Sequence, residues 1–137
     1  MAAELNQGML DFLKKNHAAI MVTARKDGSS HVARITSGVV DDKVWVSGTP
    51  ERVRTKHLRT NPMASIAVVA MDGTGNWLGI EGKVTIHEGP DAPQKALALR
   101  RSTGQAPDDV DAFIKSMVEQ KRLIYEFAPN RVYGRYE

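Results

Sequence analysis

The sequence contains no cysteine in its 137 residues. Without thiols, the chain cannot form disulfides, use a thiolate nucleophile, or hold zinc or an iron–sulfur cluster through cysteine. Its four histidines lie far apart and include no pair at the spacing of metal ligands, so we expect no metal site. Any redox chemistry must therefore come from a bound organic cofactor.

Aromatic residues make up only 6% of the chain, and none lies in its most basic segment, residues 51–61. Basic side chains interleaved with aromatic ones are typical of proteins that bind single-stranded nucleic acid, so we expect no nucleic-acid partner. No apolar run approaches the roughly 18 residues of a membrane span. The first ten residues lack the basic and then apolar order of a signal peptide. These patterns predict a cytoplasmic protein with no membrane partner.

Several common catalytic motifs are also missing. Neither GxxxxGK[ST], GxGxxG nor GxSxG occurs, and the DGTG at residues 72–75 is expected in a hairpin loop rather than ahead of a helix. These absences disfavour P-loop nucleotide hydrolysis and the doubly wound dinucleotide fold, and they leave no serine distinguished as a nucleophile.

What the chain does contain is a succession of apolar segments separated by turn residues. With 42% hydrophobic residues, its length suits one domain over residues 1–137. The Asp27-Gly28 pair predicts a tight hairpin, and glycines at 79 and 82 inside one long segment suggest the bulges or bends of barrel corners. Strands are predicted at residues 18–25, 31–40, 43–48, 63–71, 76–86, 122–129 and 130–137.

Helical periodicity and capping residues predict helices at 4–16, 90–104 and 108–121. A further, basic helix is expected to start at Thr49-Pro50 and to end at Asn61-Pro62. Hairpin-connected strands with helices inserted late favour a mainly β protein: a closed or nearly closed antiparallel β-barrel of six to seven strands, with about four helices at its periphery, rather than a parallel sheet.

The basic helix and the strand before it form a candidate anion site. Ser47 and Thr49 offer hydroxyls, the helix N-terminus offers backbone N–H groups, and Arg52 and Arg54 supply positive charge. Arginine's planar fork suits phosphate oxygens. The alternative interpretation is a helix face that is simply solvated.

The order of these motifs resembles the pyridoxamine 5′-phosphate oxidase-like flavin-binding split-barrel superfamily over nearly the whole chain. The DGS hairpin, the helix pattern R-x-R-x-x-x-L-R-x-N-P, the W-x-x-x-x-G strand and the ending P-x-R-V-Y-G carry the resemblance. Within that superfamily the chain is most similar to the short branch that often uses the deazaflavin coenzyme F420 in place of FMN. It lacks the arginine-leucine and terminal Phe-Trp features of a true pyridoxamine phosphate oxidase, so the vitamin substrate is not implied.

The resemblance implies that Arg54 and Arg52 bind the cofactor phosphate, with Lys56 as a weaker candidate. It also implies that Trp77 borders either the cofactor ring or a partner subunit, although packing within the barrel explains Trp77 equally well. The ring is expected to lie against two stretches of strand backbone, 34–38 and 47–49, which include Arg34, Thr36, Ser47, Gly48 and Thr49.

The activity that the resemblance implies is hydride transfer between bound F420 and a small conjugated organic substrate. The chain is expected to form a homodimer with cofactor sites at the subunit interface. Basic side chains at Lys56, Arg59, Arg100 and Arg101 would suit the acidic glutamyl tail of F420. An FMN-dependent oxidoreductase and a non-catalytic flavin or F420 carrier are the alternatives. No catalytic residue is implied.

Overall fold

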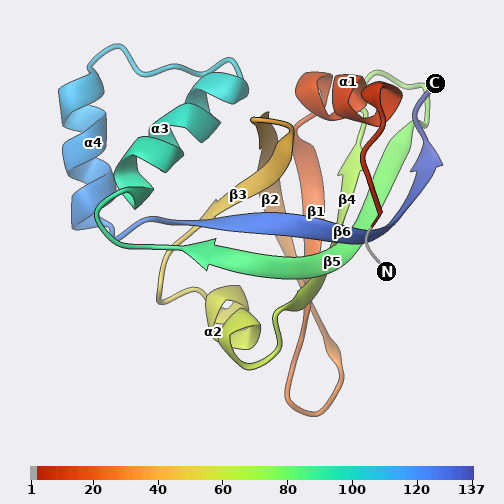
Figure 1. The fold of residues 1–137 in the computed structure, drawn as a ribbon, viewed down its shortest axis with the longest axis horizontal. Coiled ribbons are helices and arrows are strands. Elements are labelled where there is room, and N and C mark those ends of the chain that lie inside the picture. The colour runs from red at the N-terminus through yellow and green to blue at the C-terminus, as the bar shows by residue number, and fades with distance from the viewer. Residues whose placement is uncertain (1–2) are drawn as a thin grey trace.

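The computed structural model describes residues 3–137 as six strands and four helices (Figure 1). The strands are β1 (Ala18–Ala24), β2 (Ser30–Val40), β3 (Lys43–Gly48), β4 (Met63–Val69), β5 (Trp77–His87) and β6 (Leu123–Arg135). The helices are α1 (Gln7–Lys15), α2 (Val53–Thr60), α3 (Ala92–Ser102) and α4 (Val110–Glu119). None of these helices combines the length and hydropathy needed to cross a membrane.

The six strands form a closed antiparallel barrel in the order β1-β2-β3-β6-β5-β4. This confirms the predicted mainly β barrel and its range of strands and helices. The final two predicted strands are a single strand, β6. Gly82 pairs with Pro129 and Glu81 with Arg131, so the extra residue, Asn130, is absorbed in a bulge. A bulge bends a strand without ending it, which is why the proline did not mark a boundary.

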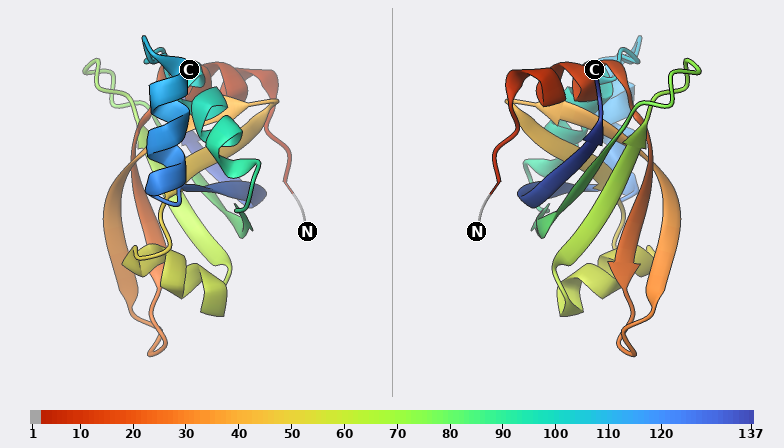
Figure 2. Two further views of the ribbon diagram at one scale, coloured as in Figure 1. Left: turned by 90° about the vertical axis from the view of Figure 1, so that its left-hand side faces the viewer. Right: turned by 90° about the vertical axis from the view of Figure 1, so that its right-hand side faces the viewer.

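The barrel interior is a packed hydrophobic core. Val68, Leu78 and Ile80 are fully buried in it, and α1 adds Phe12 and Leu13. Figures 1 and 2 show α1 over one end of the barrel and α2 over the opposite end. Each such buried side chain stabilises the fold by about 1.5–3 kcal/mol. Ligands must therefore bind outside the barrel or at its rim.

Helices α3 and α4 pack against each other, and α3 covers the outer surface of the barrel at β2, β3 and β6. A second hydrophobic cluster, which includes Trp45, Leu99 and Met117, lies beneath them. A β-carbon at Gly38 would overlap the side chains of Ser102 and Leu99, so α3 lies directly against the backbone of β2. The helices thereby create a wall next to the end of β3.

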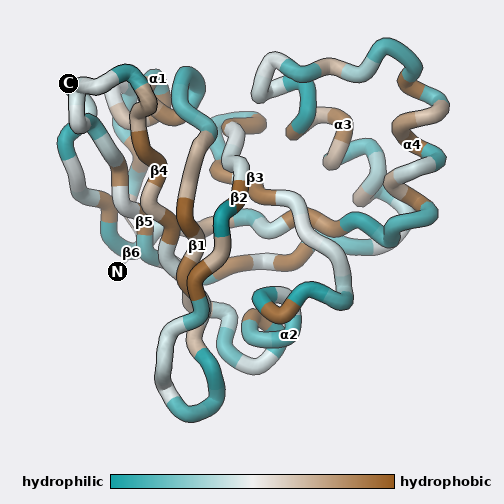
Figure 3. Tube along the Cα trace, turned by 180° about the vertical axis from the view of Figure 1, so that it is seen from behind, coloured by the Kyte–Doolittle hydropathy of each residue, from teal (hydrophilic) through white to brown (hydrophobic). Residues whose placement is uncertain are grey.

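Helix α2 starts later than the sequence predicts. Its N-cap is Arg52, and Thr49 and Pro50 belong to the preceding turn. Thr49 contributes its carbonyl rather than its hydroxyl, because that carbonyl accepts hydrogen bonds from Arg52 N (3.2 Å) and Thr55 Oγ1 (2.7 Å). The expected helix start at Thr49-Pro50 was therefore wrong. Figure 3 shows that α2 and the tip of the β1–β2 hairpin are mostly hydrophilic, whereas hydrophobic residues follow the barrel strands.

Candidate functional site

Four arginines gather around Ser47 at the end of β3. Arg52 and Arg54 come from the start of α2, Arg100 from α3, and Arg122 immediately precedes β6. Burial lowers the pKa of Arg122, and the positive charges of Arg52, Arg54 and Arg100 lower it further. We call these four residues the arginine cluster. Among residues 3–137, none of the four forms an ion pair with a carboxylate, so the cluster carries uncompensated positive charge.

Ser47 lies between two members of the cluster. The Arg54 guanidinium donates to the Ser47 carbonyl at 3.3 Å, and the Arg122 guanidinium donates to the Ser47 hydroxyl at 3.4 Å. Arg122 Nε also donates to Gln120 Oε1 at 2.7 Å. These bonds hold the two guanidinium groups on either side of one strand end.

Arg54 is half-buried, and burial lowers its pKa, with the charge of Arg52 acting in the same direction. Its guanidinium lies 5.7 Å from the centre of the Tyr125 ring. Its Nε is buried and has no hydrogen-bond acceptor among residues 3–137. An unpaired buried N–H costs about 1–3 kcal/mol, and a phosphate oxygen would supply the missing acceptor. The residues present therefore fit the phosphate of a flavin or deazaflavin.

A buried tyrosine, Tyr125, holds the start of α2 against the barrel. Thr55 uses its only hydroxyl hydrogen on the Thr49 carbonyl, so Tyr125 is the donor in the hydrogen bond between the Tyr125 and Thr55 hydroxyls. Burial raises the pKa of Tyr125, which keeps this donor protonated. A β-carbon at Gly48 would overlap the Tyr125 hydroxyl. Glycine at position 48 is thus explained by packing against Tyr125.

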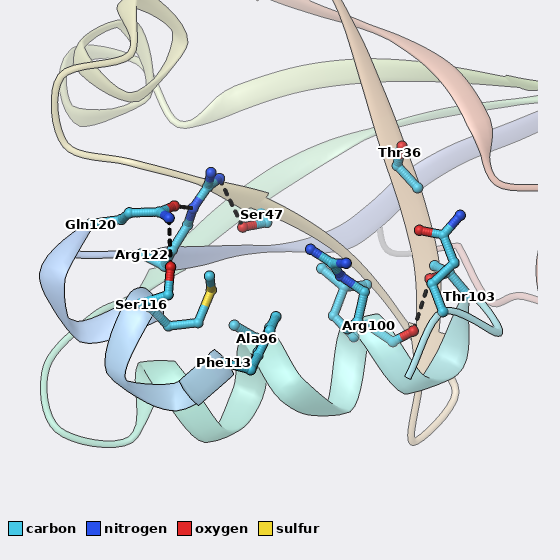
Figure 4. Close-up of a pocket in the computed structure, with 12 residues that line it drawn as sticks. Thr36, Ser47, Ala96, Arg100, Thr103, Phe113, Ser116, Gln120 and Arg122 are labelled. Atoms are coloured by element: carbon cyan, nitrogen blue, oxygen red, sulfur yellow. Dashed lines mark hydrogen bonds between the residues drawn. The ribbon is translucent and has the colours of Figure 1, made fainter. Parts of the chain in front are cut away.

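The two predicted positions on β2 lie on the outside of the barrel. Arg34 and Thr36 are exposed, whereas Ser37 points into the barrel and Gly38 is covered by α3. The structure therefore leaves only part of the 34–38 backbone open to a ring. Thr36 and Ser47 line one cavity of about 410 Å³ with Arg100 and Arg122 (Figure 4).

Trp77 also points outward from the barrel, but it belongs to β5, which lies three strands from β2 in either direction around the closed barrel. Trp77 pairs with Val69 in β4, Thr36 pairs with Ala18 in β1, and the β1–β4 register brings Ala18 and Val69 next to each other. Three strand spacings separate Trp77 from Thr36, roughly 14 Å along the sheet. The Trp77 ring instead lies 5.9 Å from the ring of Tyr133.

Lys56 is not brought together with the arginine cluster. It lines a separate cavity of about 440 Å³ with Arg25 and Lys26 of the β1–β2 hairpin and with His57. This cavity shares no lining residue with the one at Ser47.

The glutamyl-tail groove expected from the sequence is likewise not assembled. Arg59 forms a two-pronged ion pair with Glu88, at 2.9 and 3.0 Å. Only Arg100, of the four residues expected to form that groove, lines the cavity at Ser47.

Sequence reasoning missed Arg122, Thr55 and Tyr125. The alternation of Leu123, Tyr125 and Phe127 predicts that Tyr125 points inward, but no sequence pattern shows which hydroxyl it meets 70 residues away. Arg122 belongs to a Lys-Arg pair before a strand, a position where basic residues are usually solvated.

The sequence profile of the family described as pyridoxamine 5′-phosphate oxidase matches residues 5–136. The chain belongs to the pyridoxamine 5′-phosphate oxidase family. This confirms the resemblance seen in the sequence motifs. Members of this family bind flavin or F420 cofactors and are largely oxidoreductases.

Solved structures with the same fold carry different functional names. A conserved hypothetical protein of Mycobacterium tuberculosis superposes with a TM-score of 0.83 at 18% identity, over 98% of this chain and 86% of that one. An F420 reductase gives a TM-score of 0.72 at 18% identity, over 90% of this chain and 94% of that one. A heme binding protein from Mycobacterium smegmatis gives 0.70 at 14% identity, over 96% of this chain and 55% of that one. At these identities the likeness establishes the fold, and the cofactor must be argued from the site.

Proposed function

We propose that this protein is an oxidoreductase that transfers a hydride between coenzyme F420 and a small conjugated organic substrate. The observation that carries the proposal is the uncompensated arginine cluster beside Ser47, within a family that binds flavin or F420 cofactors. The motif resemblance to the F420-using branch favours the deazaflavin over FMN. An F420 reductase shares the fold, which is compatible with this choice.

The phosphate of the coenzyme would bind at Arg54 and Arg52. Arg54 offers a buried Nε that lacks an acceptor among the described residues, and Arg52 is exposed beside it. Within residues 3–137, no side chain caps the N-terminus of α2, so its positive dipole end adds to the attraction for an anion. Charge-assisted bonds from arginine are about twice as strong as neutral ones.

When bound, the deazaflavin would supply the hydride chemistry that no side chain of this chain can perform. The protein's own part is to hold the phosphate and to present the open stretch of β2 around Arg34 and Thr36 to the ring. Tyr125 and Thr55 keep the start of α2 fixed against the barrel, so Arg54 is already in place before the coenzyme arrives.

We further propose that a second copy of the chain covers the outer surface next to this site, which we call the outer sheet face. Arg34, Thr36 and Val32, which is 62% exposed, lie on its β2 side, and Trp77 lies at its β5 edge. Its apolar side chains are Ala18, Ile20, Val22, Val32, Ala67, Val69 and Trp77. A dimer formed through this face would place the ring site and Trp77 at the subunit interface, as the family resemblance implies.

Separate titrations with F420 and FMN test the proposal. Trp45 and Trp77 fluorescence and the emission of the coenzyme would both be followed. We expect F420 to bind more tightly, and the protein to accelerate oxidation of reduced F420 by a conjugated enone. Tighter binding of FMN would assign the protein to the flavin branch. Binding without acceleration across a panel of enones and quinones would favour a carrier, and binding of neither coenzyme would refute a cofactor role for the arginine cluster.

A further inference from the structure

A second part of the arginine cluster faces a cavity that phosphate binding does not use. This cavity has a volume of about 410 Å³ and lies between α3, α4 and the end of β3 (Figure 4). We call it the α3–α4 cavity. Leu99, Phe113 and Met117, with Ala96, form its apolar wall. The rest of the lining is polar and consists of Ser47, Arg100 and Arg122 together with Thr36, Thr103, Gln105, Ser116 and Gln120.

The two arginines are held in place but carry no compensating charge. Arg122 is fixed by its hydrogen bonds to Gln120 and Ser47, and the Arg100 guanidinium lies 5.2 Å from the centre of the Phe113 ring. In Figure 4 the two guanidinium groups lie near Ser47, coming from different elements. No acidic side chain lines the cavity among the residues that the structure describes. Two fixed cations facing the same space create a site for an anion.

We infer that the α3–α4 cavity binds the substrate, and that this substrate is a small organic carboxylate with an apolar, conjugated body. The inference rests on the proposed function and specifies its substrate class. Arginine forks match the geometry of a carboxylate, and the apolar wall matches a planar hydrocarbon body. The volume falls within the range of roughly 300–1,000 Å³ typical of small-molecule pockets.

The apolar wall is what favours a substrate over the acidic tail of the coenzyme. A chain of glutamates is polar along its length and offers little apolar surface to the Phe113 part of the cavity. The cavity also begins at Ser47, whose carbonyl is bonded to Arg54. A carboxylate held by Arg100 and Arg122 would therefore lie next to the proposed phosphate site, on the same side of the barrel.

Binding of trans-cinnamate to the coenzyme-free protein tests the inference, with cinnamamide as its neutral counterpart. Trp45 belongs to the same hydrophobic cluster as Leu99 and Met117, so its fluorescence would report occupancy, and calorimetry would give the affinity. We expect saturable cinnamate binding and at least roughly tenfold weaker binding of cinnamamide, because a charge-assisted hydrogen bond is lost.

Variants at the two arginines localise the site. Arg122→Gln and Arg100→Gln should each weaken cinnamate binding about tenfold or more, and Arg122→Lys should recover part of that loss because it retains the charge. Arg101→Gln is the matched control, since Arg101 is exposed on α3 and does not line the cavity. Equal affinities for cinnamate and cinnamamide, no detectable cinnamate binding, or insensitivity to Arg122→Gln would overturn the inference.

The carboxylate that binds Arg122 could belong to a substrate or to the glutamyl tail of F420. Titrations of Arg122→Gln with F420 and with FMN distinguish these two ligands. If Arg122→Gln weakens F420 binding but leaves FMN and cinnamate unaffected, the carboxylate belongs to the coenzyme tail and the substrate inference is wrong. Because cinnamate binding is measured without coenzyme, it also stands apart from the proposed function. Loss of coenzyme binding with intact cinnamate binding would refute the proposed coenzyme alone.

Discussion

The hydroxyl of Tyr125 donates a hydrogen bond to the hydroxyl of Thr55, joining β6 to the first turn of α2. Thr55 in turn donates to the Thr49 carbonyl at 2.7 Å, so two consecutive hydrogen bonds link the barrel, the helix and the turn before it. Arg54 lies on the same helical turn as Thr55, with its guanidinium near the Tyr125 ring. The position of the proposed phosphate ligand therefore depends on a residue of the barrel core.

Replacing Tyr125 by phenylalanine removes the hydroxyl but keeps the ring. We expect the free energy of unfolding to fall by about 0.5–1.5 kcal/mol, because one buried hydrogen bond is lost while Thr55 keeps its acceptor. Coenzyme affinity should fall as well, but by less than in a variant that lacks Arg54. Urea unfolding and coenzyme titration would measure both effects. Tyr133→Phe is the control, since that exposed hydroxyl donates to Glu81 and not to a residue of α2. Equal losses of coenzyme affinity in Tyr125→Phe and Tyr133→Phe would contradict a role of Tyr125 in positioning Arg54.

Gly48→Ala tests the close packing beneath α2. The added methyl group would overlap the buried Tyr125 hydroxyl, and overpacking of this kind typically costs about 1–3 kcal/mol. Gly8→Ala is the control. Its β-carbon would meet the Tyr136 ring at 3.3 Å and the Asn6 side-chain oxygen at 3.5 Å, and alanine favours a helix over glycine by about 1 kcal/mol. The midpoint temperature of thermal unfolding should be lower than that of the wild type for Gly48→Ala. For Gly8→Ala it should equal or exceed the wild-type value. A wild-type midpoint for Gly48→Ala would show that Tyr125 can move aside.

Arg54→Ala should weaken coenzyme binding roughly ten- to a hundredfold, since a charge-assisted contact to phosphate contributes about 1.5–3 kcal/mol. Arg59→Ala is the matched control on the same helix, because Arg59 is already paired with Glu88. Fluorescence titration with F420 and FMN would measure both variants. Unchanged affinity in Arg54→Ala would remove Arg54 from the phosphate site.

Val32→Glu tests the proposed dimer. Val32 is 62% exposed on the outer sheet face, and a buried unpaired carboxylate at an interface is costly. We expect sedimentation velocity to show a dimer for the wild type and a shift toward monomer for the variant. Val118→Glu provides the comparison, because Val118 is 59% exposed but lies on α4. A wild-type protein that is monomeric, or a dimer equally sensitive to both changes, would argue against this face.

Glu126 should make the fold sensitive to acid. Burial alone raises the pKa of Glu126, but hydrogen bonds from Trp45 and His87 and the charge of Lys43 bring it below its ordinary value. A carboxyl whose pKa is lower in the folded state than in the unfolded state stabilises the protein above its unfolded pKa, and this contribution disappears as the pH falls through the folded pKa.

Unfolding of wild type and Glu126→Gln between about pH 6 and pH 3 checks this expectation. The stability difference between the two proteins should be largest near pH 6 and should shrink as the pH falls. A difference that stays constant over this range would mean that the charge of Glu126 does not stabilise the fold.

Much of the fold could be read from local patterns. Alternating apolar residues between turn residues located the strands, and the helical periodicity of residues 4–16 located α1. The predicted bounds of elements were wrong where a residue that often begins or ends an element has another role in the folded protein. Pro129 lies within a continuous strand because a bulge absorbs the extra residue, and Thr49 serves a turn rather than a cap.

For the candidate site, the sequence by itself determined which basic segment offers the candidate phosphate ligands, because Ser47, Arg52 and Arg54 lie within eight residues of one another. Only the tertiary structure decided that Arg100 and Arg122 join these residues and that Lys56 and Arg59 do not. It also decided that the Tyr125 hydroxyl bonds to Thr55 at the start of α2. The reason is physical. Local spacing sets the direction of a side chain within its own element, whereas the electrostatic surroundings of a charge depend on strand register and helix packing between residues that are distant in the chain.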